Sequence, residues 1–175
     1  MTEAAGATVM VVDDEAGLAE LYSAFLGDVY DVRTATSGAE AIEKCDDTVD
    51  VLLLDRRMPQ MSGDEVLTEI RKRGLDCRVG MLSAVEPDQD IVDMPFDDYC
   101  VKPVDNDEVH AYVETLYQRR TYDDRSQEFF SLAAKKSALE KAGNDRTERY
   151  DALVEQMEDL RSEIDGVLDE LSTDE

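Results

Sequence analysis

The first 120 residues alternate between short apolar runs and longer stretches in which apolar positions recur at helical spacing. Runs such as Val9–Val12 and Val51–Leu54 are continuously apolar, as in strands buried on both faces. Leu18, Tyr22 and Phe25 recur every three or four residues, which indicates a helix. This order of strands and helices predicts an α/β fold, a doubly wound five-stranded parallel sheet with helices on both faces. The predicted strands are 8–12, 30–34, 49–54, 78–82 and 98–101, and the predicted helices are 15–27, 38–45, 63–73 and one from residue 105.

The segment between residues 84 and 98 departs from this repeat. Pro87 suits a helix start, whereas Pro95 disfavours helical backbone at Met94. Only about two turns of helix fit between the two prolines, at about 3.6 residues per turn. We therefore expect a shortened helix here.

Residues 121–175 show a different pattern, with no proline and no strand-like run. Seven apolar residues of the last part are spaced alternately by three and four positions, as in a coiled-coil seam: Tyr150, Leu153, Met157, Leu160, Ile164, Val167 and Leu171. A second apolar stripe covers Phe129–Leu139, and the turn pair Gly143-Asn144 lies between the two. A helical hairpin and a staggered, longer coiled coil both fit. The stripe must pack on its mate, on the first domain or on another chain.

Acidic side chains stand at the C-terminal ends of two predicted strands. Asp13 and Asp14 follow the strand 8–12, and Asp55 follows the strand 49–54. The carboxyl ends of parallel strands meet at one edge of the sheet, where ligands bind. Three carboxylates would repel one another there unless a hard cation lay between them, and Mg²⁺ prefers oxygen ligands. The pattern predicts a Mg²⁺ pocket with one acid free to react.

Two later strands bring a hydroxyl and an ammonium group to the same edge. Ser83 follows the strand 78–82, and Lys102 follows the strand 98–101. A cation, a lysine and a hydroxyl can share the charge of phosphoryl oxygens. The edge therefore suits a phosphoryl group.

Taken in order, these strand ends resemble the receiver domain of two-component response regulators, a flavodoxin-like fold. The resemblance covers roughly residues 7 to 120, and we place the receiver domain at residues 1–120. The matching residues are Asp13-Asp14, Asp55, Met58-Pro59 with Gly63, Ser83-Ala84, Tyr99 and Lys102-Pro103.

The resemblance implies that Asp55 is the phosphoacceptor, which attacks the phosphorus of a phosphohistidine on a histidine kinase. It implies that Asp14 binds Mg²⁺ directly and Asp13 through water, together with Asp55 and the main-chain carbonyl of Arg57. Such a protein is no enzyme beyond its own Mg²⁺-dependent phosphorylation and dephosphorylation.

The remaining receiver residues contact the phosphoryl group or report it. Lys102 is expected to contact phosphoryl oxygens, with a cis bond to Pro103. Ser83 is expected to follow the phosphoryl group, and Tyr99 to turn inward when it does. The family commonly dimerises through the surface near the fourth helix, and the shortened segment here puts that dimer in doubt.

The C-terminal segment resembles the HalX domain. The resemblance is carried by Tyr122-Asp123, by Phe129-Phe130-Ser131-Leu132-Ala133 and by Lys135-Lys136. We place this domain at residues 121–175. The family itself implies little about output, although a homodimer through the C-terminal helices is one arrangement that the seam permits.

The net charge of −25 bears on the salt concentration in which the protein works. There are 27 acidic and 11 basic residues up to Arg120, and 16 and 7 after it, so both parts are acidic. Self-repulsion of this size is screened at about molar salt, where the Debye length is about 3 Å. The composition favours a salt-rich cytoplasm, as in haloarchaea.

Two other function classes compete with a signalling switch. A phosphohydrolase or phosphotransferase would need a substrate pocket or cap insertion, and the chain has neither in its pattern. A DNA-binding transcriptional regulator remains the alternative, but an acidic C-terminal segment opposes phosphate backbones and makes nucleic acid an unexpected partner. No apolar run of about 18 residues predicts a membrane span, and the acidic N-terminus is unlike a signal peptide, so we expect a cytoplasmic protein.

Overall fold

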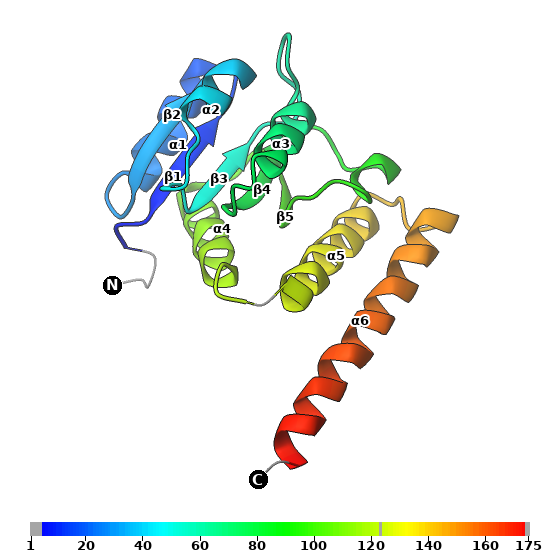
Figure 1. The fold of residues 1–175 in the computed structure, drawn as a ribbon. Coiled ribbons are helices and arrows are strands. Elements are labelled where there is room, and N and C mark those ends of the chain that lie inside the picture. The colour runs from blue at the N-terminus through cyan, green and yellow to red at the C-terminus, as the bar shows by residue number, and fades with distance from the viewer. Residues whose placement is uncertain (1–4, 123, 174–175) are drawn as a thin grey trace.

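The computed structural model describes residues 5–122 and 124–173, and side chains as far as Gly166. Within them it contains a parallel sheet of five strands flanked by helices, with a helical arm at the C-terminal end (Figure 1). The strands are β1 (Thr8–Val12), β2 (Asp31–Ala35), β3 (Val51–Leu54), β4 (Arg78–Ser83) and β5 (Asp98–Val101). The helices are α1 (Ala16–Leu26), α2 (Gly38–Lys44), α3 (Gly63–Lys72), α4 (Asn106–Arg119), α5 (Asp124–Lys141) and α6 (Glu148–Thr173), with a short 3₁₀ turn, η1 (Gln89–Ile91).

The strand order is β2-β1-β3-β4-β5, and neighbouring strands run parallel. The central strands β1 and β3 pair in register from Val9 opposite Val51 to Val12 opposite Leu54. Every residue of β3 is buried, because helices cover both faces of the sheet. The predicted doubly wound α/β fold is confirmed.

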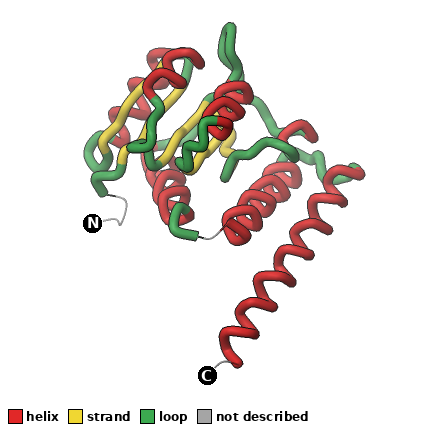
Figure 2. Tube along the Cα trace, viewed as in Figure 1, coloured by secondary structure: helices red, strands yellow, loops and turns green. Residues whose placement is uncertain are grey.

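Helices lie on both faces of the sheet, as Figure 2 shows in red against the yellow strands. On one face, buried residues of α1 and α4 pack against Val9, Val11 and Leu53. On the other face, α2 and α3 pack against Met10, Leu52 and Leu54, and Ala138 and Leu139 of α5 join the same cluster. The core on this second face therefore extends across the domain boundary expected at residue 120.

The segment between β4 and β5 forms even less helix than expected. It contains only the three residues of η1, and Pro87 precedes the turn instead of starting it. Asp88 caps the turn by accepting a hydrogen bond from the backbone of Gln89. In place of a helix from this segment, α5 covers this part of the sheet, as its contact with β5 shows (Figure 1).

Helices α5 and α6 form an antiparallel hairpin, which decides between the two predicted arrangements. Leu132 of α5 packs with Leu153 and Leu160 of α6, and Phe129 and Met157 pack around them. The Tyr150 hydroxyl donates to Glu140, and six residues later along α6 the Gln156 side chain donates to Glu128 at 3.2 Å. Later positions on α6 thus meet earlier positions on α5, as in an antiparallel pair. The side chains of Val167 and Leu171, predicted to extend the seam, lie outside the described residues.

The predicted turn pair closes the hairpin. Gly143 has a φ of 76°, a left-handed conformation that glycine adopts without a Cβ penalty. The backbone N–H of Asn144 donates to the carbonyl of Leu139, and that of Gly143 donates to the carbonyl of Glu140. These bonds satisfy carbonyl groups at the end of α5 in a Schellman arrangement.

Among the described residues, no helix is both long and apolar enough to cross a membrane.

Candidate functional site

Three carboxylates meet at the C-terminal edge of the two central strands. Asp13 follows β1 and Asp55 follows β3, and the backbone N–H of Asp55 donates to the carbonyl of Val12 across the strand pair at 2.9 Å. Carboxylate oxygens of Asp13, Asp14 and Asp55 all lie within 4.8 Å of one another. Asp13 and Asp55 are buried, whereas Asp14 is exposed. The structure thus brings together the three acids that their strand-end positions predicted.

Lys102 reaches the same pocket from the edge strand β5. Its ammonium group forms an ion pair with Asp13 and lies 3.5 Å from a carboxylate oxygen of Asp55. The peptide bond between Lys102 and Pro103 is cis, as predicted. An ammonium group therefore stands beside the acid that we expect to react.

The electrostatics of the pocket favour a bound cation. The pKa of Asp55 is raised to about 6, chiefly by burial and also by the charges of Asp13 and Asp14, while Lys102 acts in the opposite direction. Burial alone would lower the pKa of Lys102, but its hydrogen bond to Asp13 and the charge of Asp55 outweigh burial and raise it. Three close carboxylates with one lysine retain excess negative charge in a half-buried place. This oxygen-only set fits Mg²⁺.

Ser83 ends β4, where its carbonyl accepts a hydrogen bond from the backbone N–H of Lys102 at 2.9 Å, and Tyr99 lies within β5. Ser83 is fully buried, and its hydroxyl accepts a hydrogen bond from the backbone N–H of Val85 at 3.2 Å. The Tyr99 ring is buried, and its hydroxyl donates to the carbonyl of Val85 at 2.5 Å. Burial raises the pKa of Tyr99, although the neighbouring Arg56 and Ser83 side chains lower it. Both predicted switch residues therefore hold the same loop residue.

The side chain of Arg57 is exposed, and the preceding arginine is the buried one. Arg56 donates to Asp64 at the start of α3 at 3.1 Å and forms an ion pair with Asp90 of η1. Sequence reasoning missed Arg56, because two consecutive arginines after a strand give no local signal of which one turns inward. The expectation for Arg57 concerned its main-chain carbonyl, so the exposed side chain leaves that expectation open.

Gly63 explains part of the predicted turn motif that follows Asp55. Its backbone N–H donates to the carbonyl of Arg56 at 2.7 Å, at the first residue of α3. A Cβ atom at this position would lie 2.1 Å from the carbonyl oxygen of Asp55. Only glycine lets the start of α3 approach the end of β3 so closely.

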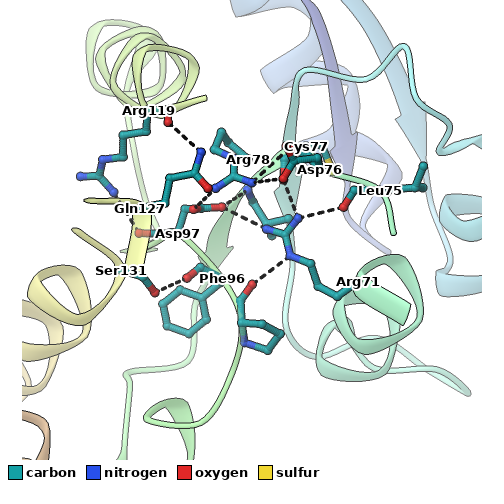
Figure 3. Close-up of polar contacts among 12 residues, drawn as sticks. Arg71, Leu75, Asp76, Cys77, Arg78, Phe96, Asp97, Arg119, Gln127 and Ser131 are labelled. Carbon is teal, nitrogen blue, oxygen red and sulfur yellow. Dashed lines mark hydrogen bonds and ion pairs between the residues drawn. The ribbon is translucent and has the colours of Figure 1, made fainter. Parts of the chain in front are cut away.

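A second polar cluster, which sequence reasoning missed, lies at the opposite edge of the sheet, where β4 and β5 begin (Figure 3). The buried carboxylate of Asp97 accepts hydrogen bonds from Arg71 at 3.1 Å and from Arg78 and the backbone of Val79 at 2.8 Å. Arg119 of α4 donates to the Asp97 carbonyl at 2.9 Å. The only sequence signal was the charge of Arg78 at the start of an apolar strand. The cluster joins α3, α4 and the sheet, and we assign it to stability.

Comparison with protein-family models gives two matches that follow one another along the chain. Residues 9–114 match the response regulator receiver domain. Residues 118–175 match the HalX domain.

Relatives include transcriptional regulators from archaea and bacteria. A Haloferax volcanii protein with the provisional name of a transcriptional regulator is 48% identical over 165 residues, which are 94% of this chain and 28% of the relative. The Haemophilus influenzae transcriptional regulatory protein CpxR homolog is 36% identical over 63% of this chain and 50% of its own length. The chain thus spans half or less of the length of these relatives.

Solved structures match the first part of the chain. Response regulator protein TrrA of Thermotoga maritima, solved in complex with Mg²⁺ and BeF, is 34% identical with a TM-score of 0.55, covering 63% of this chain and 98% of its own. The receiver domain of the Francisella response regulator 1452 is 28% identical with a TM-score of 0.58, covering 65% of this chain and 98% of its own.

Proposed function

The chain belongs to the response regulator receiver family and carries a HalX domain, and on that premise we propose that it accepts a phosphoryl group on Asp55 from a histidine kinase. The observation that supports this most directly is the position of Asp55. It is buried at a sheet edge, with Lys102 at 3.5 Å and two further carboxylates within reach of one cation.

In the proposed step a carboxylate oxygen of Asp55 attacks the phosphorus of a phosphohistidine. A P–O bond forms and the P–N bond breaks, and the imidazole nitrogen leaves with the electron pair and takes a proton from solvent. Lys102 is placed to neutralise charge on the phosphoryl oxygens. Gain and loss of this group on Asp55 is the only chemistry that we assign to the chain.

We assign Mg²⁺ to Asp13, Asp14 and Asp55, with the main-chain carbonyl of Arg57 as a further ligand. When bound, the ion neutralises charge on the transferring phosphoryl group. Support comes from the clustered carboxylates and from the Mg²⁺ in the T. maritima TrrA structure.

Ser83 and Tyr99 are the proposed switch residues. The Ser83 hydroxyl can donate to a phosphoryl oxygen while its own oxygen accepts from Val85, because a hydroxyl carries one donor and two acceptor sites. A change at Asp55 would then reach Tyr99 through Val85, which both side chains contact. The output is a population shift between two arrangements of this surface.

The helical module is the proposed output part, with the boundary between domains near residue 120. Names of relatives make DNA binding the second candidate for the output, directly or through a further domain. Helix α6 carries nine acidic and two basic residues, and this excess of negative charge argues against direct contact with phosphate backbones. We therefore favour a protein partner, which includes a second copy of this chain, in a salt-rich cytoplasm.

Labelling with a small phosphodonor tests the assignment. With Mg²⁺ the chain is expected to acquire one acid-stable, base-labile phosphoryl group from acetyl phosphate. Asp55→Asn should abolish the labelling, whereas Asp47→Asn, at an exposed aspartate before the same strand, should leave it unchanged. Undiminished labelling of Asp55→Asn protein would refute the site.

A further inference from the structure

The α5–α6 hairpin holds the loop that joins the two proposed switch residues. We name residues 84–97 the switch loop and residues 142–147 the hairpin turn. The side-chain amide of Gln89 donates to the carbonyl of Asn144 at 2.9 Å, and the Asn144 side chain donates to the carbonyl of Pro87 at 3.0 Å. The Thr147 hydroxyl donates to the side-chain oxygen of Gln89 at 2.7 Å. The hairpin turn thus fastens the switch loop by reciprocal hydrogen bonds.

Further contacts continue along α5. The ammonium group of Lys135 donates to the carbonyl of Val92 at 2.9 Å. The Ser131 hydroxyl donates to the carbonyl of Phe96 at 2.5 Å (Figure 3). Beneath them, Leu139 shares one apolar cluster with Ile91, Phe96 and Tyr99. Polar and apolar contacts therefore hold the loop over most of its length.

The same loop is tied to the Asp55 site at two places. The carbonyl of Val85 accepts one hydrogen bond from the Tyr99 hydroxyl, and the N–H of Val85 donates to the Ser83 hydroxyl oxygen. Asp90 pairs with Arg56, the residue directly after Asp55, and Arg56 is also held by Asp64. A change in the position of the loop must alter at least one of these partners of the site.

We propose that docking of the hairpin on the switch loop and stabilisation of a phosphoryl group on Asp55 are coupled, so that each favours the other. The docked hairpin fixes the loop, and the fixed loop keeps Ser83 and Arg56 in place, so the site loses less freedom when it takes up the phosphoryl group. Linkage requires that the phosphoryl group strengthens docking by the same factor. The stability of hairpin docking then depends on phosphorylation. This inference rests on the proposed function of Asp55.

The test uses the full chain at high KCl, with beryllium fluoride and Mg²⁺ as the probe. We call the hydrogen bonds between the switch loop and the hairpin turn the clamp. Gln89→Ala removes clamp bonds from the loop side, and Asn144→Ala removes them from the hairpin side. Calorimetric titration measures the affinity of each variant for the probe. Gln156→Ala is the matched control, because the side chain of Gln156 donates to Glu128 within the hairpin. We expect both clamp variants to bind the probe about fivefold more weakly than the wild type, and the control to bind as the wild type does.

Hydrogen exchange of the full chain gives the reciprocal readout. Backbone amides of the hairpin turn and the first turn of α6 should exchange more slowly when beryllium fluoride and Mg²⁺ are present. The coupling is overturned if Gln89→Ala and Asn144→Ala bind the probe as tightly as the wild type does, or if the probe leaves hydrogen exchange of the hairpin unchanged. Either result leaves the phosphoacceptor assignment standing, provided that the wild type binds the probe. Failure of the wild type to bind the probe counts against the proposed function and removes the coupling with it.

Discussion

A Cβ atom on Gly63 would lie 2.1 Å from the carbonyl oxygen of Asp55 and 2.9 Å from the Cα atom of Arg56. Both neighbours are backbone atoms next to the proposed phosphoacceptor, so neither can move without displacing the site. Gly63→Ala should therefore lower the free energy of unfolding by about 1–3 kcal/mol and reduce phosphorylation of Asp55. Thermal unfolding and acetyl phosphate labelling measure the two effects.

The control is Gly17→Ala in α1, where an added Cβ meets no heavy atom within 4 Å. Alanine there should stabilise the helix by about 0.5–1 kcal/mol and leave labelling unchanged. Equal behaviour of the two variants would show that the close approach at Gly63 has no energetic consequence.

The net charge of −25 predicts a strong dependence of stability on salt. Lowering KCl from about 1 M to about 0.1 M lengthens the Debye length from about 3 Å to about 10 Å. Repulsion among carboxylates should then lower the melting temperature. Circular dichroism measures the melting temperature across a KCl series. A constant melting temperature would remove the argument for a salt-rich setting.

Leu153 is 1% exposed and anchors the contact between α6 and α5. Leu153→Ala should leave a cavity and lower the free energy of unfolding by about 2–5 kcal/mol. Leu21→Ala is the matched control, since Leu21 is 43% exposed on α1, and its effect should stay within about 0.5 kcal/mol. Denaturant titration compares the two, and a Leu153→Ala effect as small as the control would contradict the hairpin core.

Lys135 makes stability depend on alkaline pH. Burial lowers the pKa of Lys135 from 10.5 to about 8, against the opposing charges of Asp93, Asp97 and Glu128. Between these values the unfolded chain carries a proton on Lys135 that the folded chain lacks, so stability should rise with pH across this window. Below about pH 8 both states are protonated, and the contribution no longer changes.

The measurement is the difference in unfolding free energy between wild type and Lys135→Met at fixed KCl. This difference should shift in favour of the wild type by about 1–3 kcal/mol between pH 8 and pH 10. Parallel pH curves for the two proteins would contradict a depressed pKa at this position.

Much of the site follows from local sequence. Asp13, Asp55, Ser83 and Lys102 each stand directly at the end of an apolar strand, and parallel strands bring such ends to one edge. Helix caps are equally local, since the hydroxyl of Ser37, directly before α2, accepts a hydrogen bond from the N–H of Glu40. These features depend on strand direction and on neighbours within a few residues, which the pattern of the chain records.

The sequence by itself determined the order of elements, the strand-end chemistry and the presence of two C-terminal apolar stripes. Only the tertiary structure decided that the stripes close into a hairpin, that α5 covers the sheet beside β5, and that Arg56 turns inward to Asp90. Each of these is a choice among partners distant along the chain. Periodicity shows which side of a helix is apolar, but it does not show which distant element packs against that side. Shape, ion pairing and the short η1 turn together select the partner.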